Sequence, residues 1–426
     1  MLASLLFISQ AHAFCGTYVG GAGTQQYASV STVALWRNGT RTVLSVANDV
    51  RGDTQNFVMV VPVPQVIPEE DVHVLDPEVF DRLNTYSEPR LVEYVCEDFE
   101  RTDDTGMGWT EDSTDSAWGD TADVNVEAQY IVGEYEIVIL SSEDSEALVT
   151  WLINNEYEVP IESQDMLGEY IDAGSLFFAA KIDEDADIEE GDTLSPLQFA
   201  YDSDVFSLPI RIGTLNSPGE QDLIVYGLSY FNDGYVGIAN YPDITEDIKD
   251  ECMWEDHGES FGQYYAKQFD DAYQAAGSGA WVREYSWGAS GCDPCTGDPP
   301  GYEDMVTLGM PDDARTVQDL YFTRLHMRYT PEQAHSDLTL YQSGIDEPSQ
   351  MRFIRYETFL EDQFEHCELG DIENPGSCDD PDGGAFDRDG GLFNGEALCG
   401  CSSTAPAGGA AMAVGLLGLA MVRRKR

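Results

Sequence analysis

The chain has 426 residues, of which 79 are acidic and 21 are basic, and its formal net charge is −58 at pH 7. So large a negative charge repels the phosphates of nucleic acids and of anionic lipid head groups, which excludes direct binding to either. A hydrophobic content of 42% with 11% aromatic residues is nevertheless enough for a substantial core, so the chain is not disordered throughout.

The first residues predict a secretory signal peptide. An apolar run at 2–8 precedes Ala-His-Ala at 11–13, the small-x-small pattern that signal peptidase accepts, so we expect cleavage after Ala13. The alternative is a short buried helix at the start of a domain. Phe14 stands directly before Cys15, where a bacterial lipobox needs Gly or Ala, which argues against a lipoprotein N-terminus.

Residues 26–62 have the pattern of a strand meander. Asn38 and Gly39 separate its first two strands, because both residues accept the positive φ that a tight hairpin turn requires. The third strand is expected to end at Pro62 and Pro64, since proline donates no hydrogen bond to a sheet. The three strand-like runs are 26–37, 41–49 and 56–64.

The rest of the predicted ectodomain mixes helices and strands, which indicates an α+β fold with mainly antiparallel strands. Helical patterns cover 78–86 (after Asp76-Pro77), 142–155, 163–172 and 259–276. Strand-like runs cover 124–132, 134–141, 175–182, 197–201, 207–213, 221–231, 235–241, 280–287, 319–329, 337–343 and 350–356. The acidic stretches 97–123 and 183–192 predict exposed loops, and we consider a division into two subdomains near residue 190.

The cysteines of an exported chain argue for disulfides, although their pairing cannot be read from the sequence. Within Cys292-Asp293-Pro294-Cys295 a structural disulfide is favoured, because the following prolines and glycine cannot start the helix that would activate a thiol. A metal half-site and a redox dithiol are the alternatives. The six histidines form no HExxH or similar metal pattern, and His326 is expected on a strand with a partly exposed side chain.

No nucleophile elbow, phosphate loop or dinucleotide fingerprint is present, so we predict no catalytic or cofactor-binding residue. Residues 368–398 are rich in Gly and Asp and predict a stalk. Calcium is the one cofactor considered, because this segment carries four oxygen ligands in a spacing that departs from the EF-hand; the alternative is a hydrated linker. These candidates are Asp387, Asp389, Asn394 and Glu396.

The tail at 399–426 combines a cysteine motif, an apolar segment and a basic end. The uncharged stretch 405–422 spans roughly 27 Å as a helix, and the basic residues after it should stay cytoplasmic. This arrangement resembles the myxobacterial C-terminal sorting signal called MYXO-CTERM. The resemblance implies removal of the tail by a membrane protease and retention at the surface through Cys399 or Cys401. The alternative is a retained membrane anchor.

Several stretches in order along the chain resemble the exported bacterial proteins grouped as domain of unknown function 2330. They are AFCGTYVGGA, TVALWRNGTRTVLSVAND, NFVMVVPVP, SEPRLVEY, CDPC and YFTRLHMRY. The resemblance implies a fold family and a compartment, and it carries no catalytic residue across.

The sequence thus predicts a signal peptide at 1–13, an acidic α+β ectodomain at 14–367, the stalk and the sorting tail. We expect an exported protein anchored in the envelope through its C-terminus, noncatalytic, with an envelope or extracellular partner that the sequence does not identify. The competing hypothesis is a secreted hydrolase with a carboxylate-based site. A cleft with two carboxyls of raised pKa would favour the enzyme, and acids spread over the surface would favour binding.

Overall fold

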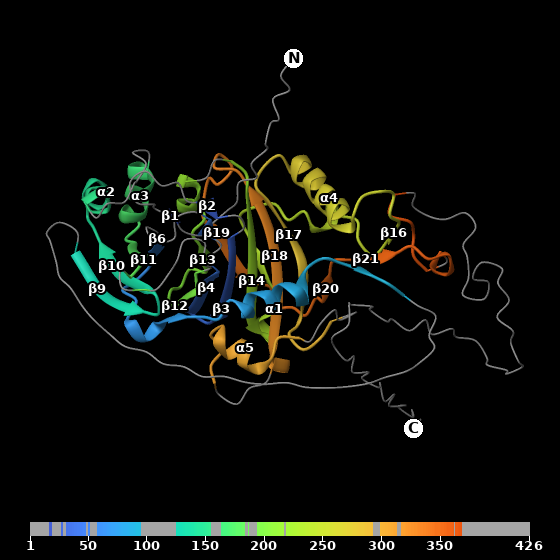
Figure 1. Cartoon of the computed structure of the whole chain (residues 1–426), viewed down its shortest axis with the longest axis horizontal. Coiled ribbons are helices and arrows are strands. Elements are labelled where there is room, and N and C mark those ends of the chain that lie inside the picture. Colours follow the sequence, from blue (N-terminus) through green and yellow to red (C-terminus); the bar gives the residue numbers. More distant parts are fainter. Residues whose placement is uncertain are drawn as a thin grey trace, which may run out of the picture.

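Two β-sheets pack face to face and carry helices on their outer faces (Figure 1). More residues lie in strands than in helices and most strand pairs are antiparallel, so the predicted α+β class is confirmed. The computed structural model describes residues 17–18, 27–28, 31–47, 50–51, 58–94, 125–154, 163–183, 186, 194–216, 219–292, 299–312, 317–361 and 363–368.

The smaller of the two sheets has five strands and two helices on its outer face. Its strand order is β1 (Thr17–Tyr18), β6 (Val58–Val63), β11 (Leu176–Ile182), β10 (Tyr135–Ser141) and β9 (Asn125–Val132). Side chains alternate between its two faces, as strands require. One face packs on the helices α2 (Ser145–Asn154) and α3 (Ser163–Asp172), and the other face contributes to the central core.

The larger sheet has eight strands, and one internal pair is parallel. Its order is β20 (Ser349–Gln350), β17 (Ala280–Gly288), β18 (Leu320–Tyr329), β14 (Gln221–Tyr230), β3 (Ser31–Asn38), β4 (Arg41–Ala47), β12 (Leu197–Asp202) and β7 (Val72–Val74). β14 pairs with β3 in parallel, and the other neighbours are antiparallel. Strands from both sides of residue 190 therefore share this sheet, and the subdivision near 190 stays a prediction.

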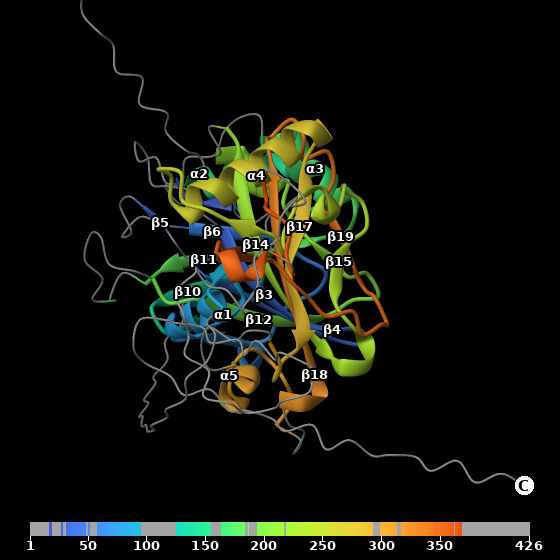
Figure 2. The same ribbon diagram turned by 90° about the vertical axis from the view of Figure 1, so that its right-hand side faces the viewer.

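The core lies between the sheets, and three helices cover the other face of the larger sheet. The inner face buries Leu35, Val225 and Leu325 against residues of the smaller sheet. On the outer face, α1 (Glu78–Ser87) and α5 (Tyr302–Thr307) pack on β3, β14 and β18, and α4 (Phe261–Ala276) packs on β17. Two perpendicular views place α4 and α5 at opposite ends of β17 and β18 (Figures 1 and 2).

The predicted hairpin of β3 and β4 is confirmed, although its turn differs by one residue. Asn38 pairs with Arg41, so the loop consists of Gly39 and Thr40. Gly39 has a φ of +60° and is the first loop residue, which fits a type II′ turn.

The predicted meander is wrong in its third strand, because β6 belongs to the other sheet. β6 also runs through Pro62 to Val63. On its β1 side it pairs only at Met59 and Val60, so this edge tolerates a proline.

The remaining strands form small sheets. These are β13 (Ser207–Leu208), β19 (Leu338–Gln342) and β15 (Val236–Ile238); β16 (Met253–Trp254), β21 (Arg352–Arg355) and β8 (Arg90–Val92); and β2 (Tyr27–Ala28) with β5 (Val50–Arg51). The strand expected at 350–356 is thus divided between β20 and β21.

Several predicted segments lie outside the described residues. They are the signal peptide 1–13, the acidic loop 97–123, most of the loop 183–192, the stalk from 369 onward and the tail 399–426. Within the part of the chain that the structure describes, no helix has the length and apolar character needed to cross a membrane.

Candidate functional site

Three neighbouring strands carry charged side chains on the face of the larger sheet that α4 partly covers. Alternate residues of a strand share a face, so Arg324, His326 and Arg328 of β18 point the same way. The antiparallel register sets Asp222 of β14 opposite Arg328. Acidic and basic groups thereby meet on one face of the sheet.

A β-bulge in β17 adds a carboxylate to this group. Arg283 pairs with Leu325 and Tyr285 pairs with Arg324, so the register shifts and Glu284 is the extra residue between them. A bulge redirects side chains and interrupts strict alternation. Glu284 consequently lies with Arg324, and only 1% of its side chain is exposed.

Both carboxylate oxygens of Glu284 have partners in neighbouring side chains. Its Oε2 accepts a hydrogen bond from Nε of Arg324 at 2.5 Å, and its Oε1 accepts one from the Tyr265 hydroxyl at 2.7 Å. The same Oε1 lies 3.0 Å from Nδ1 of His326. Nη1 of Arg324 also donates to Oδ1 of Asn84 at 2.7 Å, so the guanidinium is tied to α1 as well.

Asp222 closes the network on the other side of the imidazole. Its Oδ1 lies 3.0 Å from Nε2 of His326, and both carboxylate oxygens accept from Arg328, at 2.7 and 3.0 Å. The ring of Phe269 on α4 stacks on His326 with 4.2 Å between centroids and 6° between planes. We call Asp222, Glu284, Arg324, His326 and Arg328 the charge network.

His326 is held as an imidazolium. Each ring nitrogen faces a carboxylate oxygen, and both nitrogens must carry a proton to donate to both acceptors. Burial disfavours the charged ring, but Glu284 and Asp222 outweigh it and raise the pKa of His326 to about 9. The ring is therefore protonated at neutral pH.

The two carboxylates of the charge network are held ionised. Burial opposes ionisation of Glu284, but Arg324 and His326 outweigh it and lower its pKa to about 2. The pKa of Asp222 is also lowered, since hydrogen bonds from His326 and Arg328 overcome its burial. A general base near pH 7 needs a free lone pair and a pKa close to 7. The charge network offers neither.

Three other carboxyls have raised pKa values, each with partners of its own. Burial raises the pKa of Asp250 to about 6, with the charge of Glu251 adding to the effect. Burial also raises the pKa values of Glu220 and Asp337. Asp337 is bound by the Tyr170 hydroxyl, whereas Glu220 lies near Arg328. Burial is the leading cause of all three shifts.

A cavity of roughly 480 Å³ lies at the β4 and β12 end of the larger sheet. Its walls include Trp36, Gln198 and Met310, with Arg41 and Asp71 among the polar residues. Arg41 is ion-paired with Asp71, so the acid in this wall already has a cationic partner.

The disulfide between Cys252 and Cys367 joins the segment before β16 to the end of the described chain. Beside it, Glu255, His257 and His366 offer ligand atoms that all lie within 4.8 Å of one another. Residues of this kind bind transition metals. The group was missed in the sequence: Glu255 and His257 are two residues apart, but their meeting with His366 depends on the fold.

The residues selected from the sequence have mixed outcomes. Cys292 is disulfide-bonded, whereas Cys295 lies outside the described residues, so the pairing of these two cysteines stays a prediction. His326 is on a strand and partly exposed, but its part in the charge network was missed. The processing and calcium candidates all lie outside the described residues: Ala13, Cys399, Cys401, Asp387, Asp389, Asn394 and Glu396.

Comparison with known proteins gives one match. The family described as "Uncharacterized protein conserved in bacteria (DUF2330)" matches residues 9–341. No curated protein and no solved structure matches the chain.

Proposed function

Since the chain belongs to the DUF2330 family, whose description gives no activity, we propose from its own residues that it is an exported, envelope-anchored binding protein without catalytic activity. The partner sits outside the cytoplasm, and the C-terminal tail supplies the attachment.

The proposal that the protein is noncatalytic rests on the charge network, whose charged groups are paired with one another. The charged groups of Glu284, Asp222 and Arg324 contact other residues of the chain, and His326 is sandwiched between two carboxylates under Phe269. Catalytic acids and bases have pKa values matched to proton transfer. Ion pairs of this kind, with depressed carboxyl and elevated imidazole pKa values, favour a structural role.

The disulfide between Cys252 and Cys367 supports the compartment. Disulfides persist in oxidising environments and are rare in the reducing cytosol. Cys252 is buried, and the pair joins positions 115 residues apart in the sequence. Such a link in the folded core fits a protein that matures after export.

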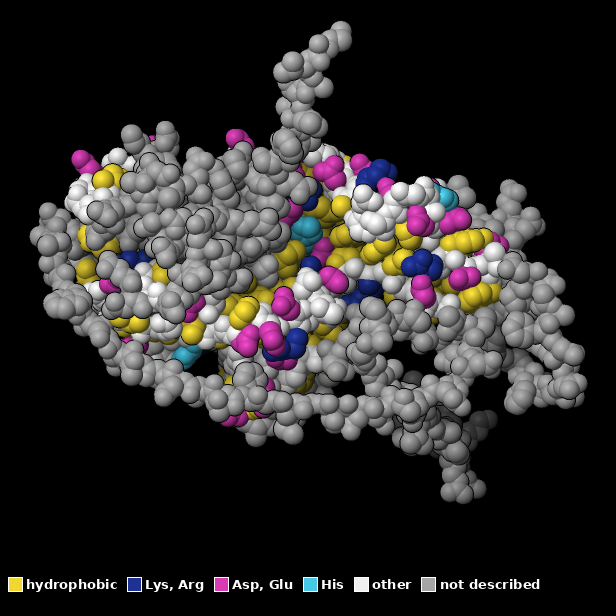
Figure 3. Space-filling model, viewed as in Figure 1, with side chains coloured by type: hydrophobic (Ala, Val, Ile, Leu, Met, Phe, Trp, Pro, Cys, Tyr) yellow, Lys and Arg dark blue, Asp and Glu magenta, His cyan; other side chains and the backbone are white. Residues whose placement is uncertain are grey.

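The distribution of acids supports binding. Acidic side chains are spread over the described surface in Figure 3, with Lys and Arg among them. A net charge of −58 steers basic partners and cations toward the protein and repels other anions. The proposed partner is accordingly a basic or cation-bridged component of the envelope.

Mass spectrometry of the protein from washed envelopes of the native host tests export and anchoring. We expect a mature form that starts at Phe14 and ends near Cys401 with added lipid mass. Full-length protein that still bears Arg426 in the membrane fraction would replace the sorting signal with a simple anchor. Recovery from the cytosol with Met1 retained and Cys252 reduced would overturn the proposal.

A further inference from the structure

Two histidines and a glutamate meet beside the Cys252–Cys367 disulfide. The Nε2 atoms of His257 and His366 each lie 3.9 Å from Oε2 of Glu255. The three ligand atoms are mutually within 4.8 Å. His366 is nearly enclosed, with 6% of its side chain exposed, whereas the other two side chains are about half exposed. The group is therefore buried at His366 and open to solvent at Glu255 and His257.

Backbone pairing and the disulfide hold the two contributing segments together. Met253 forms a parallel bridge with His366. The Met253 N–H donates to the Glu365 carbonyl at 2.8 Å, and the Cys367 N–H donates to the Met253 carbonyl at 2.8 Å. Cys252 is bonded to Cys367 directly beyond this bridge. The separation of the ligands is thus set by the fold rather than by mobile side chains alone.

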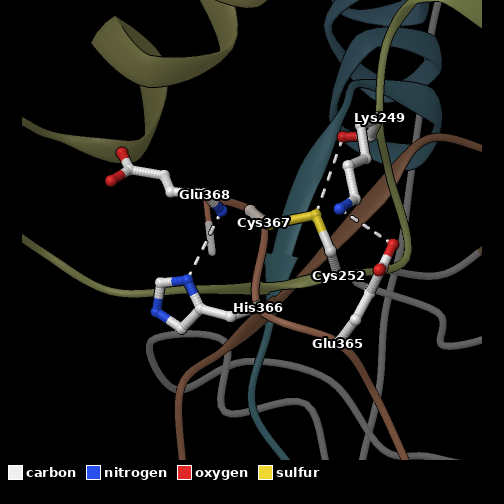
Figure 4. The surroundings of a disulfide bond; sticks show 6 residues. All are labelled: Lys249, Cys252, Glu365, His366, Cys367 and Glu368. Carbon is white, nitrogen blue, oxygen red and sulfur yellow. Dashed lines mark hydrogen bonds and ion pairs between the residues drawn. A yellow bond between two sulfur atoms is a disulfide. The ribbon is translucent and has the colours of Figure 1, made fainter. Parts of the chain in front are cut away.

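Lys249, the lysine beside the disulfide, is paired with another acid and not with Glu255. Figure 4 shows Lys249 and Glu365 on the far side of the disulfide from the His366 ring, and their ion pair measures 2.9 Å. The Asp256 carboxylate accepts a hydrogen bond from the Gly258 N–H at 2.8 Å. Among the described residues, the ion-pair partners of Glu255 are His257 and His366 themselves.

We propose that Glu255, His257 and His366 bind one Zn²⁺ ion through one carboxylate oxygen and two imidazole nitrogens. A tetrahedral zinc site with ligand distances near 2.0 Å has its ligands roughly 3.3 Å apart. The 3.9 Å separations close to this value through small side-chain rotations. Three protein ligands leave the fourth position for water or for a group on a partner.

Binding at Nε2 of His366 also fixes its tautomer. In the free protein Nδ1 accepts from the Glu368 N–H at 3.4 Å (Figure 4). Zinc at Nε2 places the ring proton on Nδ1, so this long and weak hydrogen bond is lost on binding. The Glu368 amide is therefore a local reporter of occupancy.

The ligand set favours zinc over the abundant alkaline-earth ions. Calcium and magnesium prefer sites made wholly of oxygen ligands, whereas imidazole suits zinc, copper and nickel. We expect the scattered carboxylates of this acidic chain to bind calcium at many positions, since carboxylate oxygens are calcium ligands. Excess Ca²⁺ can therefore mask them and leave the histidine site free.

The test is calorimetric titration of the purified, oxidised full chain with Zn²⁺ in excess Ca²⁺, after treatment with a chelator. We expect one zinc ion per chain. His257→Ala and His366→Ala should each weaken binding at least about tenfold, the scale of loss typical at metal sites. His335→Ala, which removes an exposed histidine elsewhere in the fold, should leave the affinity unchanged.

His257→Ala is the decisive variant, because 54% of the side chain is exposed and its loss leaves the core intact. Zinc binding of unchanged affinity in this variant would overturn the proposal. The absence of zinc binding by the wild-type chain in excess Ca²⁺ would overturn it as well. A zinc-dependent shift of the Glu368 amide resonance in the wild type, missing in the variant, would place the ion at this group.

Discussion

At the scale of residues, the charge network stabilises the fold only while every member is present. Removing an ion from water costs several kcal/mol, and paired geometry has to offset that cost. Glu284 offsets it for both Arg324 and His326, through contacts of 2.5 and 3.0 Å. The network is therefore most sensitive to loss of this one carboxylate.

Glu284→Gln should lower the free energy of unfolding by about 3–5 kcal/mol, because it leaves buried cations without their shared counter-charge. Urea denaturation of the full chain measures this loss. Glu169→Gln is the matched control: Glu169 also binds an arginine, Arg211, at 2.6 Å, but 61% of its side chain is exposed. The control should cost far less, because water screens the exposed Glu169–Arg211 pair. Equal losses in both variants would contradict the assignment.

The raised pKa of His326 makes stability depend on pH on the alkaline side. The imidazolium is favoured in the folded state, so its contribution is complete below pH 6.5 and is lost as the pH rises through about 9. The loss amounts to roughly 3 kcal/mol between these limits, from about 1.4 kcal/mol per pH unit.

Denaturation curves between pH 6 and pH 10 test this dependence, with His326→Gln as the reference that lacks the titrating ring. The difference between the two proteins should shrink as the pH rises. Parallel pH profiles for the wild type and the variant would mean that folding leaves the pKa of His326 unshifted. That result would also reopen a role for the ring as a base.

Of the five residues in the charge network, only His326 was singled out from the sequence. Strand periodicity placed His326 on β18 and its side chain as partly exposed, which holds. Strict alternation in β17 gives no sign of the register shift at Glu284. The partners of His326 come from β14 and β17, and single-sequence patterns specify the type of an element better than its neighbours.

At the scale of elements, α4 shows how local signals fix a helix. Ser260 accepts from the Gln263 N–H at 3.3 Å while the Gln263 side chain accepts from the Ser260 N–H at 2.8 Å, which forms a capping box. Gly277 ends the helix with a φ of +66° in the left-handed region. These two caps define the helix that places Phe269 over His326.

Two glycines near the ends of α4 should respond oppositely to alanine. Neither has a heavy atom within 4 Å of the added Cβ, so space does not distinguish them. Gly277→Ala should destabilise by about 1 kcal/mol because of its positive φ. Gly262→Ala, inside the helix, should stabilise by roughly 0.5 kcal/mol. Thermal denaturation measures both changes, and shifts of the same sign would contradict this account.

Elements governed by neighbouring residues were predicted well, and pairings between distant ones were not. The helix expected at 163–172 matches α3 over its full length, because its signals are local. The run at 56–64 was recognised as a strand, yet its sheet was wrong. Hydrophobic periodicity identifies a strand without naming its partner.

At the scale of the molecule, the Cys252–Cys367 disulfide links two segments that are 115 residues apart. A cross-link over so long a loop restricts the unfolded chain strongly. The Cys252→Ala/Cys367→Ala double variant should lose about 2–5 kcal/mol of unfolding free energy. The measurement is urea denaturation beside the oxidised wild type and the wild type in reductant. A loss below about 1 kcal/mol would show that noncovalent packing alone sets the stability of this region.

The parallel pairing of β3 with β14 has a consequence for the order of folding. Residues 31–36 cannot find their β14 partners, 223–228, until more than half of the chain is available. Contacts between such distant segments slow folding, because the entropy of loop closure is lost before the strand pairing can offset that loss. During synthesis both outer edges of the β3–β4 hairpin are unpaired until β12 and then β14 have been made. The proposed export of an unfolded chain is compatible with this order of folding, because the larger sheet would assemble only after β14 has followed β3 across the membrane.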